Sequence, residues 1–215
     1  MSLPHAVIIA GGKGERLGGV RKADLRIGGI RLVDRVAKAL GAVAGPLMIS
    51  AGSRDDWRNL PNGAIAIADL DAPMGGPLAG LAATVATLQD RGIGEGLLVS
   101  VAVDTPFLPT DFVARLRVGL DETPAAYAAW EEQFYPPNAV WRIEALADLS
   151  GMVRQGRAAP SLKALQRELG ARAVNWSGHA GGNPFANINT VADLIALGRI
   201  ERNRGPSPLI HTPGN

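Results

Sequence analysis

The fold is decided by residues 6–22, which read AVIIAGGKGERLGGVRK. An apolar, β-branched run (Val7, Ile8 and Ile9) passes directly into a loop rich in glycine and basic side chains. Glycine lets the main chain approach an anion closely, so that backbone N–H groups, Lys and Arg can bind a phosphate. Because such sites recur directly after the first strand of α/β proteins, we expect a strand at residues 5–10 followed by a phosphate-binding loop.

Two well-known phosphate-binding loops do not match this stretch. The Walker A loop requires Ser or Thr after its Gly-Lys pair, whereas Lys22 follows Arg21 and precedes Ala23. The dinucleotide fingerprint requires its third glycine where Leu17 stands. It also requires an acidic residue after the second strand, where residues 50–52 are Ser-Ala-Gly. The sequence therefore excludes both loops.

Composition indicates an ordinary globular protein. The chain has 215 residues, of which 47% are hydrophobic and 20% charged, and this length suits one sizeable domain. No apolar stretch reaches the roughly 18 residues that a membrane span needs, and no signal segment precedes Val7. Cysteine is absent, which excludes thiolate metal sites and is compatible with the cytoplasm. A net charge of +2 does not favour nucleic acid, so we expect a cytoplasmic protein with neither membrane nor nucleic-acid partners.

Short apolar runs alternate with helical patterns, which predicts a doubly wound α/β fold with a mostly parallel sheet and helices on both faces. In the first half, strands are expected at residues 5–10, 47–51, 64–68 and 96–103, and helices at 31–44, 78–89 and 110–118. In the second half, strands are expected at 125–130, 138–141 and 172–176, a turn at 131–137, and helices at 142–155, 161–169 and 191–199. Residues 1–200 are expected to form a single domain and residues 201–215 a disordered tail.

The glycine-rich loop resembles the signature of sugar-nucleotide and cofactor nucleotidyltransferases, in which Ala-Gly-Gly, Arg-hydrophobic-Gly and Lys follow a strand. Here these elements are residues 10–12, residues 16–18 and Lys22. Within that superfamily the chain resembles molybdenum cofactor guanylyltransferase, because three further segments agree in order: residues 75–81 (GGPLAGL), 104–109 (DTPFLP) and 185–190 (FANINT). The resemblance extends to about Leu197 and implies a Rossmann-like nucleotidyltransferase fold.

The resemblance also implies the reaction: transfer of GMP from GTP to molybdenum-molybdopterin, with Mg²⁺ as cofactor and release of pyrophosphate. The N-terminal half would bind the nucleotide and the C-terminal half the pterin. Pterin-delivering proteins and molybdoenzyme chaperones would dock transiently. Three alternatives stay open: a CTP-dependent cytidylyltransferase, another cofactor- or sugar-phosphate nucleotidyltransferase, and a non-catalytic nucleotide-binding module. The cytidine branch has Ala-Ala-Gly where this chain has Ala-Gly-Gly, so Gly11 would leave room for a purine.

Two charged residues at the expected site carry most of the chemistry. Asp104 follows the most apolar strand, where open α/β sheets bind ligands, and a carboxylate there could hold Mg²⁺. The alternative is a turn cap before Thr105 and Pro106, and the resemblance favours metal binding. Lys22 would place positive charge over the triphosphate, unless it is a solvated loop lysine.

Arg21 stands where the family usually has an acidic residue. It either strengthens phosphate binding or faces water.

Two further groups concern substrate recognition. Asp69 ends the third strand and can pair with the N1–H and amine of guanine, or cap a turn; the family's Asn after the second strand is absent. Asn187 and Asn189 alternate in an extended segment, which puts both amides on one face, although Asn189 or Thr190 could instead cap the next helix.

The catalytic candidates are Lys22, Asp104 and Arg16. The nucleotide-binding candidates are Ile9, Ala10, Gly11, Gly12, Lys22, Asp69 and Asp104. The pterin-binding candidates are Arg16, Gly19, Asn187 and Asn189, and the metal ligand is Asp104.

Overall fold

The structure is a computed structural model that describes residues 2–11, 21–50, 52, 57, 59–72, 75–179 and 182–203. Most of the basic loop, and with it the candidates Gly12, Arg16 and Gly19, lies outside the described residues. The predicted tail lies outside them from residue 204 onward.

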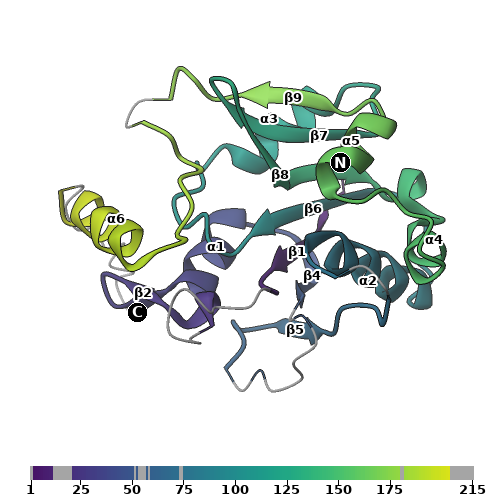
Figure 1. Cartoon of the computed structure of the whole chain (residues 1–215), viewed down its shortest axis with the longest axis horizontal. Coiled ribbons are helices and arrows are strands. Elements are labelled where there is room, and N and C mark those ends of the chain that lie inside the picture. Colours follow the sequence, from purple (N-terminus) through teal and green to yellow (C-terminus); the bar gives the residue numbers. More distant parts are fainter. Residues whose placement is uncertain are drawn as a thin grey trace, which may run out of the picture.

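The described residues contain a seven-stranded sheet with the order β5-β4-β1-β6-β8-β7-β9 (Figure 1). Its strands are β1 (His5–Ile9), β4 (Ala44–Ser50), β5 (Ala64–Ile67), β6 (Leu97–Ala102), β7 (Ala125–Trp130), β8 (Gln133–Arg142) and β9 (Arg172–Asn175). Strands β5, β4, β1 and β6 run parallel, β8 runs antiparallel to β6 and β7, and β9 runs parallel to β7. The predicted mostly parallel, doubly wound sheet is confirmed.

Helices cover both faces of the sheet, and each face has its own hydrophobic core. One core contains side chains of α1 (Leu32–Leu40), α3 (Phe112–Leu120) and α6 (Val191–Asn203). The other contains side chains of α2 (Pro77–Asp90), η3 (Ile143–Leu146), α4 (Leu149–Arg154) and α5 (Leu162–Glu168). The central strands β1 and β6 are almost wholly buried, as their continuous apolar runs predict, whereas the edge strand β9 has no buried residue. In the described part of the chain, no helix is both long enough and apolar enough to span a membrane.

Several element boundaries differ from the predictions, and β4 begins three residues early, at Ala44. Helix α1 ends at Leu40, four residues early, because Gly41 adopts a positive φ of 67°. The helix predicted from residue 142 is instead the short η3 and α4, because the Arg142 N–H still pairs with the Pro124 carbonyl at 2.8 Å and keeps Arg142 in strand β8. The last predicted helix continues past residue 199 to Asn203.

The predicted turn at residues 131–137 is wrong over most of its length, because β8 begins at Gln133 and includes Pro136 and Pro137. Proline is tolerated in a strand where no ladder hydrogen bond needs its missing N–H. Pairing of β8 with β6 stops at Ala139, and pairing with β7 shifts its register between Tyr127 and Ala128. The two prolines therefore occupy a stretch where the regular ladder is interrupted, and β8 extends beyond the end of β6.

Candidate active site

The carboxyl ends of β1 and β6 lie where the direction of strand addition reverses. After β1 the chain adds β4 and β5 on one side, and then returns to add β6 on the other side of β1. Open α/β sheets bind ligands at such a point. A cavity of about 330 Å³ is present at this edge. It is lined by six of the predicted site residues: Ile9, Ala10, Gly11, Lys22, Asp104 and Asn187.

A single ammonium group joins the charged candidates. Lys22 Nζ donates to Asp104 Oδ2 at 2.8 Å and to Asn189 Oδ1 at 2.9 Å. The side chains of Lys22 and Asp104 are 27% and 17% exposed, so both can still be reached from solvent. Three segments far apart in sequence therefore meet at one point, and Lys22 is not the solvated loop lysine of the alternative interpretation.

The position of Lys22 is set by a short structure that the sequence did not predict. Lys22 begins the 3₁₀ helix η2 (Lys22–Asp24), which leads into a small hairpin of β2 (Arg26–Ile27) and β3 (Ile30–Arg31). The neighbouring Ala23 is fully buried. Arg31 pairs with Asp24 at 3.6 Å and with Asp34 of α1 at 2.7 Å, which ties η2 to the helix. The hydrogen bond that Arg31 donates to Asp34 raises the pKa of the Arg31 guanidinium.

The segment that carries the two asparagines is attached to the loop of Asp104. The Ile188 N–H donates to the Asp104 carbonyl at 3.1 Å. Ile188 is buried, whereas Asn187 and Asn189 are exposed, which confirms the predicted alternation. The backbone thus directs Asn187 into the cavity and Asn189 to Lys22.

The helix after this segment is capped by Thr190, and not by Asn189. Thr190 Oγ1 accepts from the Asp193 N–H at 3.1 Å, while Asp193 Oδ2 accepts from the N–H groups of Asn189 and Thr190. This reciprocal pair is a capping box at the start of α6. The N–H of Asn189, helped by Thr190, lowers the pKa of Asp193. The side-chain amide oxygen of Asn189 therefore takes no part in the cap and accepts from Lys22.

Asn138 of β8 is a site residue that sequence analysis missed. Its Oδ1 accepts from the Ala102 N–H at 2.8 Å and lies 3.4 Å from Thr105 Oγ1, so it holds both ends of the turn that carries Asp104. Asn138 lines the cavity and is 1% exposed, and its Nδ2 has no hydrogen-bond partner among the described residues. Asn138 begins the strand predicted at residues 138–141, where no motif marked it, and the turn predicted at residues 131–137 concealed its neighbours Phe134, Tyr135, Pro136 and Pro137, which also line the cavity.

Asp69 lies beside the glycine loop, at the ends of β4 and β5. Its Oδ1 accepts from Ser50 Oγ at 2.6 Å, and its N–H donates to the Gly52 carbonyl at 3.1 Å. A Cβ on Gly11 would lie 3.1 Å from the Gly52 nitrogen and 3.4 Å from Asp69 Oδ2. The space beside Gly11 is thus filled by protein, so the idea that this glycine leaves room for a purine is not what the geometry indicates. Gly11 instead allows two loops to pack closely.

Arg21 contacts an aromatic side chain from another segment of the chain. Its guanidinium lies 5.3 Å from the centroid of the Trp57 ring, within the range of a cation–π contact. The contact is between the residue that precedes Lys22 and the segment that follows β4. We infer that Arg21 holds these two segments together.

Comparison with known proteins identifies the family. The model of the MobA-like NTP transferase domain matches residues 6–174. The chain belongs to this family. The MobA-like family model spans the β1 loop, Lys22, Asp69 and Asp104, so these site residues lie within the matched domain. The chain is accordingly a nucleotidyltransferase, as the sequence predicts.

Relatives within the MobA-like family cover nearly the whole chain. A protein of Acidiphilium cryptum named molybdenum cofactor guanylyltransferase is 37% identical over 89% of this chain and 92% of its own length. A protein of the same name from Cereibacter sphaeroides is 34% identical over 87% of this chain and 92% of its own length.

Solved structures agree on the fold. Molybdopterin-guanine dinucleotide biosynthesis protein A from Archaeoglobus fulgidus has a TM-score of 0.70 at 20% identity, covering 93% of this chain and 99% of its own. The 2-C-methyl-D-erythritol 4-phosphate cytidylyltransferase of Thermus thermophilus has a TM-score of 0.62 at 18% identity, covering 94% of this chain and 100% of its own. At these identities the likeness is one of fold alone.

Proposed function

We propose that this chain transfers GMP from GTP to molybdenum-molybdopterin, releasing pyrophosphate and forming the guanine dinucleotide form of the cofactor. The observation that carries the proposal is the Lys22 ammonium, held between Asp104 and Asn189 at the switch point of the sheet. The names of the relatives that cover most of the chain support the choice of GTP and molybdopterin.

The reaction is an in-line displacement at phosphorus. An oxygen of the terminal phosphate of molybdopterin forms a bond to the α-phosphorus of GTP, and the bond from that phosphorus to the β-phosphate oxygen breaks. The electron pair leaves with pyrophosphate. Because the attacking phosphate is already anionic near neutral pH, no strong general base is needed. Catalysis then rests on positioning and on neutralising negative charge.

The described residues suit these tasks. Lys22 is a point charge that can turn from Asp104 toward the phosphates of GTP as charge moves to the leaving group. The Asp69 carboxylate, oriented by Ser50, would accept from the N1–H and amine of guanine. Asn187 lines the cavity on the side of the C-terminal segment, where the attacking phosphate would enter for an in-line approach. Arg16 and Gly19 stay predictions for binding of the pterin phosphate.

A divalent metal fits the oxygen donors of this site. Asp104 Oδ2 and Asn189 Oδ1 both point at one cationic group, and hard oxygen donors of this kind suit Mg²⁺, which takes one or two protein carboxylates plus phosphate oxygens. No group of three His, Cys, Asp or Glu side chains in the described ranges could hold a metal, so substrate oxygens would complete the coordination. When bound, Mg²⁺ would neutralise the developing charge on the phosphates.

Pyrophosphate release tests the proposal. Wild-type protein with GTP, Mg²⁺ and molybdopterin should release pyrophosphate, and replacing GTP by CTP should abolish most of it. Asp104→Asn should lower turnover about 100-fold or more, since an amide lacks the charge that holds the cation. Asp111→Asn, an exposed aspartate in the helix cap after the same turn, is the matched control and should keep full activity. Turnover with CTP equal to that with GTP would refute the guanylyl assignment and leave the transferase class intact.

The setting of the reaction follows from the same proposal. We place the reaction in the cytoplasm, with transient docking of pterin-delivering proteins and of molybdoenzyme chaperones. Support for this comes from the family resemblance and from the cysteine-free composition.

A further inference from the structure

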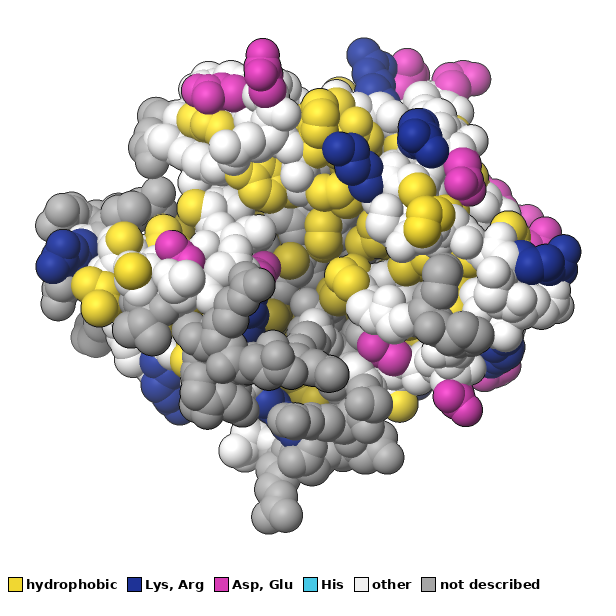
Figure 2. Space-filling view, in the orientation of Figure 1, with side chains coloured by type: hydrophobic (Ala, Val, Ile, Leu, Met, Phe, Trp, Pro, Cys, Tyr) yellow, Lys and Arg dark blue, Asp and Glu magenta, His cyan; other side chains and the backbone are white. Residues whose placement is uncertain are grey.

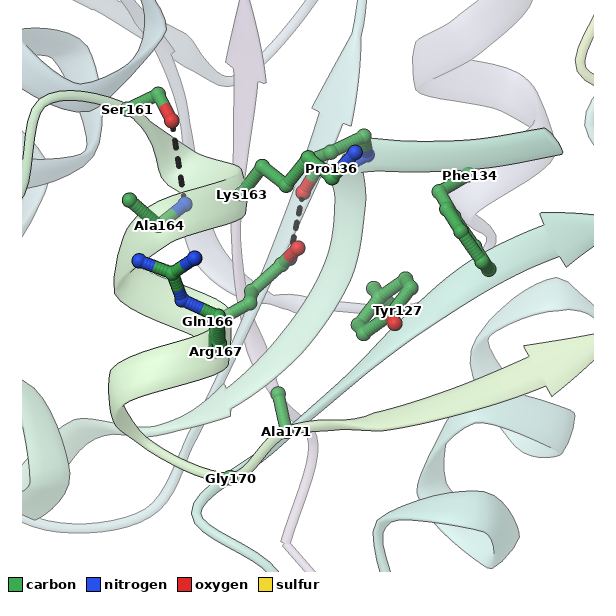
Figure 3. Close-up of a pocket in the computed structure, with 10 residues that line it drawn as sticks. All are labelled: Tyr127, Phe134, Pro136, Ser161, Lys163, Ala164, Gln166, Arg167, Gly170 and Ala171. Atoms are coloured by element: carbon green, nitrogen blue, oxygen red, sulfur yellow. Dashed lines mark hydrogen bonds between the residues drawn. The ribbon is translucent and has the colours of Figure 1, made fainter.

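A second cavity lies outside the site described above. It has a volume of about 600 Å³ and is bounded by α5 on one side and by β7 and β8 on the other (Figure 3). Cavities that bind small molecules commonly measure about 300–1,000 Å³. Of the predicted site residues that the structure describes, none lines this cavity.

The two cavities are neighbours. Phe134 and Pro136 of β8 line both of them. Gln166 of α5 donates to the Pro136 carbonyl at 2.9 Å and is 2% exposed, so the helix is anchored to the strand at this shared boundary. In Figure 2 a band of hydrophobic side chains, with basic side chains beside it, reaches the hollow at the centre of this face. A ligand that extends past Phe134 could therefore occupy both cavities.

The second cavity combines positive charge with aromatic surface. Lys163 and Arg167 line it, four residues apart on α5 and hence on one side of the helix, and none of its described lining residues is acidic. Lys163 extends from the helix toward Pro136 (Figure 3), and its Nζ lies 5.8 Å from the centroid of the Phe134 ring. Phe134 is 47% exposed and makes an edge contact with Tyr127, with 5.9 Å between centroids. This chemistry suits an anionic ligand with a planar ring.

The cavity that contains Lys22 and Asp104 must admit a triphosphate together with the attacking phosphate. The rest of the second substrate, a heterocycle with an anionic metal-binding end, then needs a space next to that cavity. The cavity beyond Phe134 is adjacent, larger, cationic and partly aromatic.

We propose that the cavity between α5 and the β7–β8 pair binds the pterin ring and metal-bearing end of molybdopterin, with Phe134 against the ring and Lys163 against the negative charge. This inference rests on the proposed function and extends it from the attacking phosphate to the body of the substrate. It assigns to residues outside the predicted set a role in selecting the second substrate.

Charge reversal at Lys163 tests the inference. Lys163→Glu should raise the KM for molybdopterin about tenfold or more and weaken binding of molybdopterin alone, measured by gel filtration without GTP, to a similar extent. The dissociation constant of GTP should stay within about threefold, as expected when a contact to only one substrate is lost. Phe134→Ala should also raise this KM about tenfold, because a stacked ring contact is removed. Lys163→Arg should retain binding.

The matched control is Lys38→Glu, an identical charge reversal at an exposed lysine of α1, on the opposite face of the sheet. It should leave both KM values unchanged. If wild-type protein turns over molybdopterin while Lys163→Glu and Phe134→Ala keep its KM within about twofold, the second cavity is not the pterin site and the proposed function stands. If wild-type protein neither binds nor turns over molybdopterin, the proposed function itself fails, and this inference fails with it.

Discussion

Gly80 in helix α2 has no room for a side chain, and this makes Gly80→Ala a sharp test of the nucleotide site. A Cβ at this position would overlap Ser50 Oγ and lie 3.0 Å from Ser50 Cβ and 3.3 Å from Asp69 Oδ1. Ser50 would have to rotate, and its 2.6 Å hydrogen bond to Asp69 would break. The substitution should therefore disturb the carboxylate proposed to recognise guanine.

The expected magnitude follows from opposing contributions. Alanine is favoured over glycine in a helix interior by about 1 kcal/mol. Overpacking a buried position costs about 1–3 kcal/mol, and losing a hydrogen bond to a charged group costs about 1.5–3 kcal/mol. Because rotation of Ser50 relieves part of the overlap, we expect a net loss of about 2 kcal/mol. In a chain of this size that corresponds to a fall in Tm of about 4–8 °C.

The assay is thermal unfolding with and without GTP, together with the GTP dissociation constant, which should rise about tenfold. Gly151→Ala in α4 is the matched control, because nothing lies within 4 Å of the added Cβ, and its Tm should hold or rise. Ser50→Gly in the Gly80→Ala background removes the overlapping atoms, so the two substitutions should show a coupling of about 1 kcal/mol or more. A Tm for Gly80→Ala at or above that of the wild type would refute the reasoning.

Three further predictions concern the opposite side of the site, the support of the Asp104 turn, and pH. Asn187→Ala should raise the KM for the pterin or lower turnover, while the GTP dissociation constant stays within about threefold of the wild-type value. GTP binding about tenfold weaker, with an unchanged KM for the pterin, would contradict the assignment of Asn187 to the pterin. Asn138→Ala leaves the Ala102 N–H without its acceptor and should destabilise the fold by about 1–3 kcal/mol in denaturant unfolding, whereas an unchanged midpoint would exclude this support. Burial lowers the pKa of His5 from 6.5, so the unfolded chain binds more protons than the folded one, and the free energy of unfolding should fall as pH drops from 6.5 toward the pKa of folded His5. The Tm of His5→Gln should depend less on pH over this window than the Tm of the wild type. The same dependence of Tm on pH in both proteins would rule out His5 as the cause.

The elements that sequence analysis predicted well are those encoded by local pattern. The continuous apolar runs of β1 and β6 leave few alternatives to buried parallel strands, and Asp104 after β6 then lies at the ligand-binding edge. Alternation in residues 185–190 was enough to put Asn187 and Asn189 on one side. In each case the residue and its neighbours in sequence carry the information.

What could not be predicted depends on contacts between distant segments. Pro136 and Pro137 indicate a turn when only their missing N–H groups are considered, yet β8 extends past the end of β6, where those groups are not needed. Asn138 became a site residue only through its bond to Ala102. The cavity between α5 and β8 requires the packing of a helix on a strand, which no local pattern specifies.

The contact between Lys22 and Asn189 spans 167 positions of the chain, and this has a consequence for synthesis on the ribosome. The sheet order allows β1, β4, β5 and β6 to pair while the later segments are still being made. The contact of Lys22 with Asn189, however, cannot form until residues 187–189 have emerged and the Ile188 N–H has reached the Asp104 carbonyl. A nascent chain can thus pair its first four large-sheet strands early, whereas the Lys22–Asn189 contact forms only after residues 187–189 have been synthesised.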